Sequence, residues 1–341
     1  MTQHQYIDRK TGRVATESFY QDRLVQFLYG RARESAPRLF NWLTDRRSTR
    51  VLAYLNYDTM IGAPSMRRFL TSQSVDLSEC EDDPRTFKTM RQWFERKIRY
   101  WERRPMPAPQ DIVVAPADAR ALLGSFANAS ALFIKEKFFT LEELLGTDKD
   151  WTGRFRHGDF AVFRLTPEKY HYNHAPVSGR VCDIYDIDGR YHSCNPGAAL
   201  CVATPYSKNR RVVTIIDTDV VGGSNVGIVA MIEIVALMIG QIEQCYSAHR
   251  YTDPMPVVPG LFVERGQPKS LFRPGSSTTV LIFEPGRVRF ALDLLCNQRR
   301  ADAQSRYSIA LGAPAVETDV QVRSALGHAI VRHEEEQYAD R

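Results

Sequence analysis

Apolar residues in the first third of the chain recur at helical spacing. The pattern is present at positions 20–29, 39–43 and 87–101, where apolar side chains return every three or four residues. Prolines at positions 105, 107 and 109 then prevent a helix from continuing. The pattern predicts a mostly helical N-terminal region over residues 1–106.

From position 111 onward the pattern changes to short apolar runs separated by Gly, Pro, Asn and Asp. The runs are IVVA, ALFI, FAVFRL, RVVTII, VGIVAMIEIV, TTVLIF and VRFALDLL. Such runs predict β-strands, and Thr140 before LEELL predicts one short capped helix. We therefore expect an α+β fold, in which the helical region precedes a predominantly antiparallel β catalytic domain over residues 107–331. A charged tail follows at residues 332–341.

Composition narrows the functional classes. A hydrophobic content of 43% and a charged content of 25% are typical of a globular protein. The net charge of +5 comes with no zinc-finger, basic-zipper or aromatic RNA-binding pattern, so we expect no nucleic-acid partner. Residues 226–242 form a long apolar stretch, but it contains Glu233 and is shorter than the roughly 20 residues that a spanning helix needs. We expect buried strands there.

The cysteines and the start of the chain bear on the compartment. None of the six cysteines forms a C-x-x-C pair, which indicates reduced thiols and neither a disulfide framework nor a metal site. The first residues, MTQHQYIDRKTG, lack the apolar core of a signal peptide. The sequence therefore predicts a cytoplasmic protein whose membrane contact, where it has one, is peripheral.

A pair of serines in FRPGSSTTVLIFE is the first candidate for chemistry. Ser276 and Ser277 follow a Pro-Gly turn and directly precede a predicted strand. A serine in a strained turn can attack the preceding carbonyl when a base accepts its proton. The resulting ester can eliminate to dehydroalanine, which hydrolyses to a pyruvoyl group. In isolation a Gly-Ser-Ser sequence is usually only a turn.

Two further motifs supply acid–base groups. His171 and His174 lie three residues apart in FRLTPEKYHYNHAPVSG, where they can serve as a general base and a second proton carrier. No third metal ligand is evident beside them, and two hydrogen-bonding loop histidines are the simpler alternative. Asp118 follows a predicted strand in VVAPADAR, where its carboxylate can orient a histidine. A turn aspartate is the commoner explanation.

Taken in order, these motifs resemble the phosphatidylserine decarboxylase family. RLTPEKYHYNHAPVSG is similar to that family's L-x-P-x-D-Y-H-R-x-H-x-P-x-x-G signature, and VVAPADA is similar to its S-P-x-D-G segment. VGGSNVG resembles V-G-A-x-x-V-G, and the GSST run resembles the terminal G-S-T cleavage motif. The stretches WFERKIRYWERRPM, IKEKFFTLEELLG, HSCNP and NRRVV also resemble family segments, so the resemblance runs from about position 87 to 283 in one order.

The resemblance implies a role for each motif residue. Asp118 and His174 match the Asp and the second His that form a self-processing triad with the cleavage serine, and His171 matches the His implicated in decarboxylation. When the strand TTVLIF is aligned with the corresponding family strand, Ser277 falls at the position of the cleaved serine. This is the preferred alignment. The alternative keeps Gly275-Ser276 but shifts the strand by one residue and reverses its faces. Cleavage would give two chains that stay together and a covalent pyruvoyl cofactor, which forms a Schiff base with the substrate amine.

The departures from the family pattern concern the substrate. Ala119 replaces a glycine, and the D-Y-H-R segment has Lys169 and Tyr172 in place of its acid and its arginine. Loss of the arginine weakens the case for a phosphate-bearing lipid. The preferred function is conversion of phosphatidylserine to phosphatidylethanolamine. The alternatives are decarboxylation of a soluble, for example aromatic, amino acid, or a non-enzymatic β-rich binding protein. A homo-oligomer is compatible with each.

Overall fold

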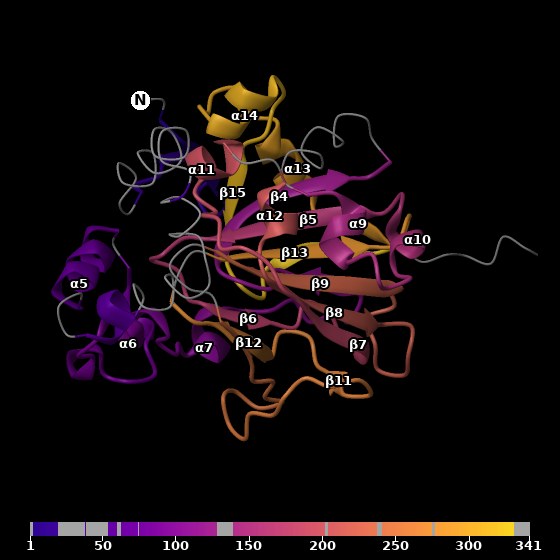
Figure 1. Cartoon of the computed structure of the whole chain (residues 1–341), viewed down its shortest axis with the longest axis horizontal. Helices are drawn as coiled ribbons and strands as arrows, with labels where there is room; N and C mark the ends of the chain where they lie inside the picture. Colours follow the sequence, from indigo (N-terminus) through magenta and orange to yellow (C-terminus); the bar gives the residue numbers. More distant parts are fainter. Residues whose placement is uncertain are drawn as a thin grey trace, which may run out of the picture.

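The computed structural model describes residues 3–19, 38, 54–59, 63–73, 75–127, 139–201, 204–236, 241–274 and 277–330. A ten-stranded sheet forms its centre, in the order β11-β7-β8-β9-β13-β5-β4-β15-β1-β2 (Figure 1). The strands of this sheet are β1 Gln5–Asp8, β2 Val14–Thr16, β4 Ala119–Ser125, β5 Asp159–Leu165, β7 Gly179–Ile187, β8 Arg211–Asp217, β9 Ile228–Val235, β11 Phe262–Val263, β13 Ser277–Phe283 and β15 Glu317–Val320. Every pairing is antiparallel except that of β1 with β15. The predicted α+β fold is confirmed.

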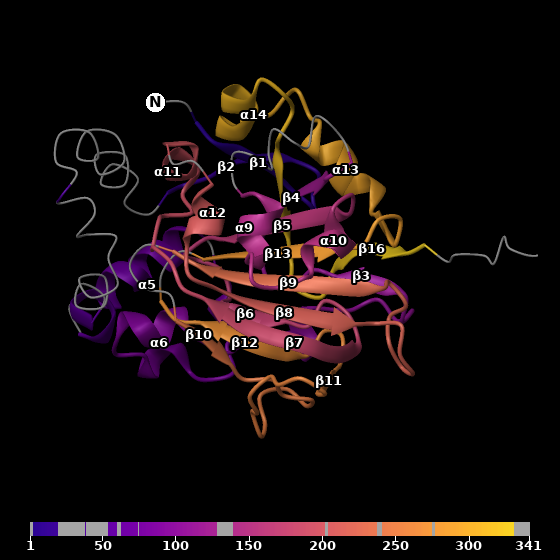
Figure 2. The ribbon, with the colours of Figure 1, turned by 45° about the vertical axis from the view of Figure 1, so that its right-hand side comes forward.

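Two further sheets each have three strands. One has the order β10-β12-β6 and the other the order β14-β16-β3. Their strands are β3 Ile112–Val114, β6 Tyr172–His174, β10 Ile242–Gln244, β12 Pro268–Phe272, β14 Val288–Phe290 and β16 Ala325–Ala329. Figure 2 shows β6, β10 and β12 together, to the left of β7 and β8 in that view.

The helices are short. The α-helices are α5 Ala63–Ser72, α6 Met90–Phe94, α7 Tyr100–Arg103, α9 Leu141–Leu145, α10 Thr152–Phe155, α11 Pro196–Cys201, α12 Pro205–Lys208, α13 Leu292–Gln298 and α14 Arg306–Leu311. Single turns are η2 Tyr54–Asp58, η3 Leu77–Glu79 and η4 Pro84–Thr86. Thr140 caps α9 as predicted, since its hydroxyl accepts a hydrogen bond from the Glu143 amide at 3.2 Å. No helix in the described part of the chain has the length and apolar character needed to cross a membrane.

The large sheet separates two hydrophobic cores. One face packs against α9, α10, α12 and α14, with Leu144, Phe155 and Ile232 among the buried side chains. The other face packs against the two small sheets, with Phe163, Ala175 and Phe272 between the layers. Strand β13 lies in the middle, between β9 and β5, and all seven of its residues are buried. A central strand covered on both faces gives an unbroken apolar run such as TTVLIF, which explains why the sequence pattern identified it.

Two predictions about elements need correction, and others concern residues that the structure does not describe. Residues 5–16 do not continue a helical region: they form β1 and β2, which extend the large sheet through β15. The run VRFALDLL is not one strand, because β14 ends at Phe290 and α13 begins at Leu292. The helical patterns at 20–29 and 39–43, the run ALFI at 131–134 and the tail at 332–341 lie outside the described residues. None of the six cysteines is joined in a disulfide.

Candidate active site

Ser277 is the first residue of β13. Its backbone is paired with Leu165 of β5 on one side and with Val235 of β9 on the other. The side chain is buried, and its hydroxyl has no hydrogen-bond partner among the residues that the structure describes. A buried hydroxyl without a partner costs free energy, so such a group in a folded chain indicates strain or chemistry. Gly275 and Ser276, the alternative cleavage position, lie outside the described residues.

His171 precedes β6 and is fully buried. Its ring stacks on Phe94 of α6, with centroids 3.5 Å apart. Within the described part of the chain, neither ring nitrogen makes a side-chain hydrogen bond. Burial and the nearby Arg96 guanidinium lower the pKa of His171 well below its usual value. The ring is therefore neutral near pH 7, so one of its nitrogens can accept a proton.

The chain connections bring Ser277 and His171 to the same end of the space between the layers. The Thr279 hydroxyl on β13 donates a hydrogen bond to the Asn173 side-chain oxygen on β6 at 2.9 Å. Ser277 lies two residues before Thr279, and His171 lies two residues before Asn173. Residues 166–170 and 273–274 leave their strands at this end, where the Phe272 amide donates to the His171 carbonyl. Within the described residues, a hydroxyl without a hydrogen-bond partner and a histidine whose ring makes no side-chain hydrogen bond thus lie at the same end.

His174, the last residue of β6, occupies a different environment. Its Nδ1 lies 2.8 Å from the Gly266 carbonyl, and its Nε2 lies 2.9 Å from the Tyr170 hydroxyl. Because a carbonyl can only accept, Nδ1 carries the ring proton and Nε2 accepts from Tyr170. Gly266 has a φ of +78°, and a Cβ there would lie 2.3 Å from the Met106 sulfur, so this turn requires glycine. Burial lowers the pKa of His174 to about 3.

Asp118 stands just before β4 and is also buried. Its carboxylate accepts two or more hydrogen bonds from the Arg104 guanidinium, the shortest at 2.8 Å, and another from the Val322 amide at 2.8 Å. Burial raises the pKa of this carboxyl, but Arg104 outweighs burial and holds the pKa below its usual value. Asp118 is therefore ionised at neutral pH.

The predicted triad is not connected by hydrogen bonds in this structure. Among the described contacts, the Asp118 oxygens bind Arg104 and Val322, while the His174 nitrogens bind Tyr170 and Gly266. The backbones are close, since the His174 amide donates to the Pro116 carbonyl at 2.7 Å. Sequence reasoning missed Arg104 and Tyr170 as partners of the predicted residues. Both lie within stretches that resemble the family, but no spacing rule identifies them as partners.

A polar cavity opens beside Asp118. It has a volume of about 350 Å³, and its lining includes Arg96, Arg104, Asp118, Lys169 and Tyr170. A second cavity, of about 60 Å³, lies at the end of β5 beside Leu165, the backbone partner of Ser277. Glu168 lines both cavities, so the two spaces adjoin beside Asp118 and the end of β5.

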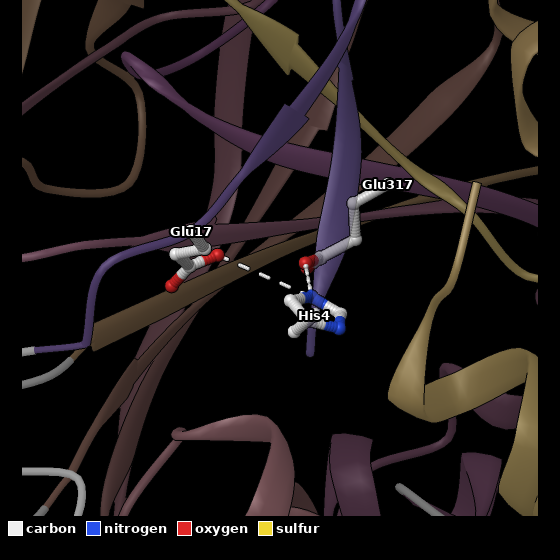
Figure 3. A group of neighbouring side chains, drawn as sticks. All are labelled: His4, Glu17 and Glu317. Atoms are coloured by element: carbon white, nitrogen blue, oxygen red, sulfur yellow. Dashed lines mark hydrogen bonds and ion pairs between the residues drawn. The ribbon is translucent and has the colours of Figure 1, made fainter. Parts of the chain in front are cut away.

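A separate group of ligand-type side chains joins the N-terminal segment to the sheet. His4 Nε2 lies 2.8 Å from a Glu317 oxygen and 4.0 Å from a Glu17 oxygen (Figure 3). The Arg306 amide donates to His4 Nδ1 at 3.1 Å, so Nε2 carries the proton and donates to Glu317. With both nitrogens engaged, His4 has no free lone pair for a cation.

Arg164 of β5 neutralises the two carboxylates of this group. Its guanidinium approaches Glu17 to 2.6 Å and Glu317 to 2.5 Å. Burial raises the pKa of Glu317, but Arg164 and His4 lower it to about 2. The group is thus a buried ion-pair network that ties residues 4–17 to β5 and β15.

Comparison with known proteins is consistent with this geometry. The phosphatidylserine decarboxylase family model matches residues 90–305, which include β3 to β13 and all of the motif residues discussed above. The phosphatidylserine decarboxylase proenzyme of Chlamydia trachomatis serovar L2 is 30% identical over 302 residues, covering 85% of this chain and 90% of that protein.

Other relatives carry the same description. The phosphatidylserine decarboxylase proenzyme of Fusobacterium nucleatum is 28% identical over 302 residues, covering 86% of this chain and 91% of that protein. Phosphatidylserine decarboxylase proenzyme 3 of Schizosaccharomyces pombe is 30% identical over 255 residues but is much longer, so that only 25% of it is covered. The chain belongs to the phosphatidylserine decarboxylase family and is a carboxy-lyase.

Proposed function

We propose that this decarboxylase cuts itself before Ser277 and uses the resulting pyruvoyl group to convert phosphatidylserine to phosphatidylethanolamine. The observation that supports it most is the buried hydroxyl of Ser277, which has no partner in the described part of the chain, at the start of a central strand. The relatives that cover most of this chain are named phosphatidylserine decarboxylase proenzymes, and a proenzyme is a chain that is processed.

The self-processing chemistry uses only groups of this chain and water. A base takes the Ser277 proton, and the Ser277 oxygen attacks the carbonyl of residue 276. The peptide C–N bond breaks, and the freed nitrogen receives the proton, which leaves an ester. Loss of the α-proton of residue 277 then breaks the ester C–O bond and gives dehydroalanine. Addition of water and release of ammonia complete the ketone. The products are chain 1–276 and a shorter chain 277–341.

His174 and Asp118 remain our predicted processing residues, and His171 our predicted proton donor in decarboxylation. The low pKa of His174 leaves it neutral, as a base must be. To act on Ser277, however, its Nε2 has to exchange the Tyr170 hydroxyl for that of the serine. A pyruvoyl group at position 277 supplies a ketone for the substrate amine and accepts the electrons released with carbon dioxide. The neutral His171, whose ring nitrogens make no side-chain hydrogen bond within the described residues, is our candidate for protonating the resulting carbanion.

Two single variants separate these roles. His174→Asn is expected to leave the chain uncut. His171→Asn is expected to be cut normally but to lose about a hundredfold or more in kcat, because general acid–base groups contribute roughly that much. Intact mass measures the cut, and carbon dioxide release measures kcat. An uncut His171→Asn chain together with a cut His174→Asn chain would exchange the two roles.

The lipid substrate is supported by the names of the relatives that cover most of this chain. One observation favours a soluble amino acid instead: Tyr172 stands where the family signature has arginine, and its ring packs on Tyr170 and not on a basic group. In a carbon dioxide release assay, phosphatidylserine in detergent micelles is expected to be turned over, whereas free serine, tryptophan and tyrosine are not. Turnover of free amino acids alone would contradict the lipid assignment.

A further inference from the structure

A buried polar network crosses the space between the large sheet and the sheet of β6, β10 and β12. Its members come from five strands: Asn173, Glu233, Gln244, Lys269, Ser270 and Thr279. Every one of them except Gln244 is completely buried. The network is separate from the groups that carry out the proposed processing, but it reaches β13 two residues after Ser277.

Glu233 of β9 is the centre of this network. One carboxylate oxygen accepts hydrogen bonds from the Lys269 ammonium and the Gln244 amide, each at 2.8 Å. The other accepts from the Asn173 amide at 3.2 Å and from the Ser270 hydroxyl. Four donors thus satisfy the buried carboxylate, and Lys269 balances its charge.

This arrangement fixes the orientation of Asn173. A carboxylate can only accept, so the Asn173 NH₂ group must face Glu233, and its carbonyl oxygen must face the other way. The Thr279 hydroxyl donates to that oxygen at 2.9 Å. The charge pair therefore determines which atom Asn173 offers to β13.

A buried ion pair is a poor source of stability. Removing two charges from water costs about as much as their attraction returns, and apolar residues of equal volume often stabilise a core as well or better. The position of this pair suggests a different use. Asn173 lies between the two signature histidines, and Thr279 lies on the strand that the proposed cut releases.

We propose that Asn173 and Thr279, held in orientation by the Glu233–Lys269 pair, position the new N-terminus of chain 277–341 after cleavage. This inference rests on the proposed function. The cut breaks the peptide bond before residue 277. The position of residue 277 then depends on the backbone pairing of β13 and on side-chain contacts. The bond between Thr279 and Asn173 lies two residues from the cut and joins the new chain to β6.

The neighbouring threonine provides a matched control. Thr278 is equally buried on the same strand, but its side chain points to the opposite face of the sheet, and its hydroxyl makes no hydrogen bond to this network. Thr279→Val and Thr278→Val each replace a hydroxyl by a methyl group of similar size. Thr279→Ser keeps the hydroxyl and loses a methyl group.

The experiment compares the three variants with the wild type after self-processing. Cleavage is checked by intact mass, and kcat and KM are measured with phosphatidylserine in detergent micelles. We expect Thr279→Val to be cut and to show a kcat about tenfold lower with KM nearly unchanged, since small misplacements of reacting groups are costly. Thr279→Ser is expected to recover most of kcat, and Thr278→Val to keep it.

The possible outcomes separate the positioning role of Thr279 from the proposed function on which it rests. A cut wild type, with Thr279→Val as active as Thr278→Val, would overturn the positioning role alone. Loss of kcat in both valine variants, with no recovery in Thr279→Ser, would also overturn it, because that pattern is general damage to packing. A wild type that is never cut would overturn the proposed function together with this inference.

Discussion

Ser277→Ala is expected to remain a single uncut chain with no detectable decarboxylase activity. The substitution removes only the Ser277 oxygen, which makes no hydrogen bond within the described residues, so the fold should lose little. Without that oxygen there is neither a nucleophile for cleavage nor a precursor for the ketone. Intact mass and carbon dioxide release measure the two losses, and a thermal unfolding midpoint close to the wild type shows that the variant is folded.

Ser276→Ala is the matched control. It alters the other serine of the pair and is expected to be cut, because the preferred register places the scissile bond after residue 276. An uncut Ser276→Ala chain together with a cut Ser277→Ala chain would move the site one residue towards the N-terminus. In that case an additional residue would precede β13 in the new chain.

Arg164→Met is expected to destabilise the protein by about 3–5 kcal/mol, the usual cost of removing one partner from a buried ion pair. Arg164 is 4% exposed and neutralises Glu17 and Glu317, which are themselves almost completely buried. Methionine preserves much of the volume but leaves the two carboxylates with His4 and the more distant Arg120. The free energy of unfolding in urea is the measurement.

Arg154→Met serves as the comparison for that variant. Arg154 pairs with Glu284 at 3.0 Å, but its side chain is 56% exposed. An exposed pair is usually worth about 0–1 kcal/mol. Similar small losses in both variants would contradict the view that the Arg164 network anchors residues 4–17 to the sheet.

The sequence predicted the central strands well, and for a physical reason. Strands such as β9 and β13 are covered on both faces, so that apolar and β-branched side chains occupy most of their positions and the run stands out. Strands β1 and β2 were missed because they have only four and three residues, QYID and VAT, which is too short for a recognisable apolar pattern. Their place in the fold depends on the parallel pairing with β15, some three hundred residues away, which no local pattern contains.

The sequence motifs nominate candidate site residues, whose roles stay predictions, but they do not give the contacts of those residues. The signature motifs identified Asp118, His171 and His174 because each carries a group suited to proton transfer. Which groups contact them depends on how the chain folds back on itself: Arg104, 14 residues earlier, binds Asp118, and Phe94 stacks on His171. The buried pair of Glu233 and Lys269 could not be predicted either. A charged residue in an apolar run indicates that it needs a partner, but the sequence does not say which residue that partner is.

The intact mass of the purified wild-type protein tests the central claim most directly. The account predicts two chains, 1–276 and 277–341. The second should be lighter by one molecule of ammonia than the same fragment with an N-terminal serine, and it should react with phenylhydrazine through its ketone. A single chain of 38.9 kDa that never yields these fragments would contradict the account.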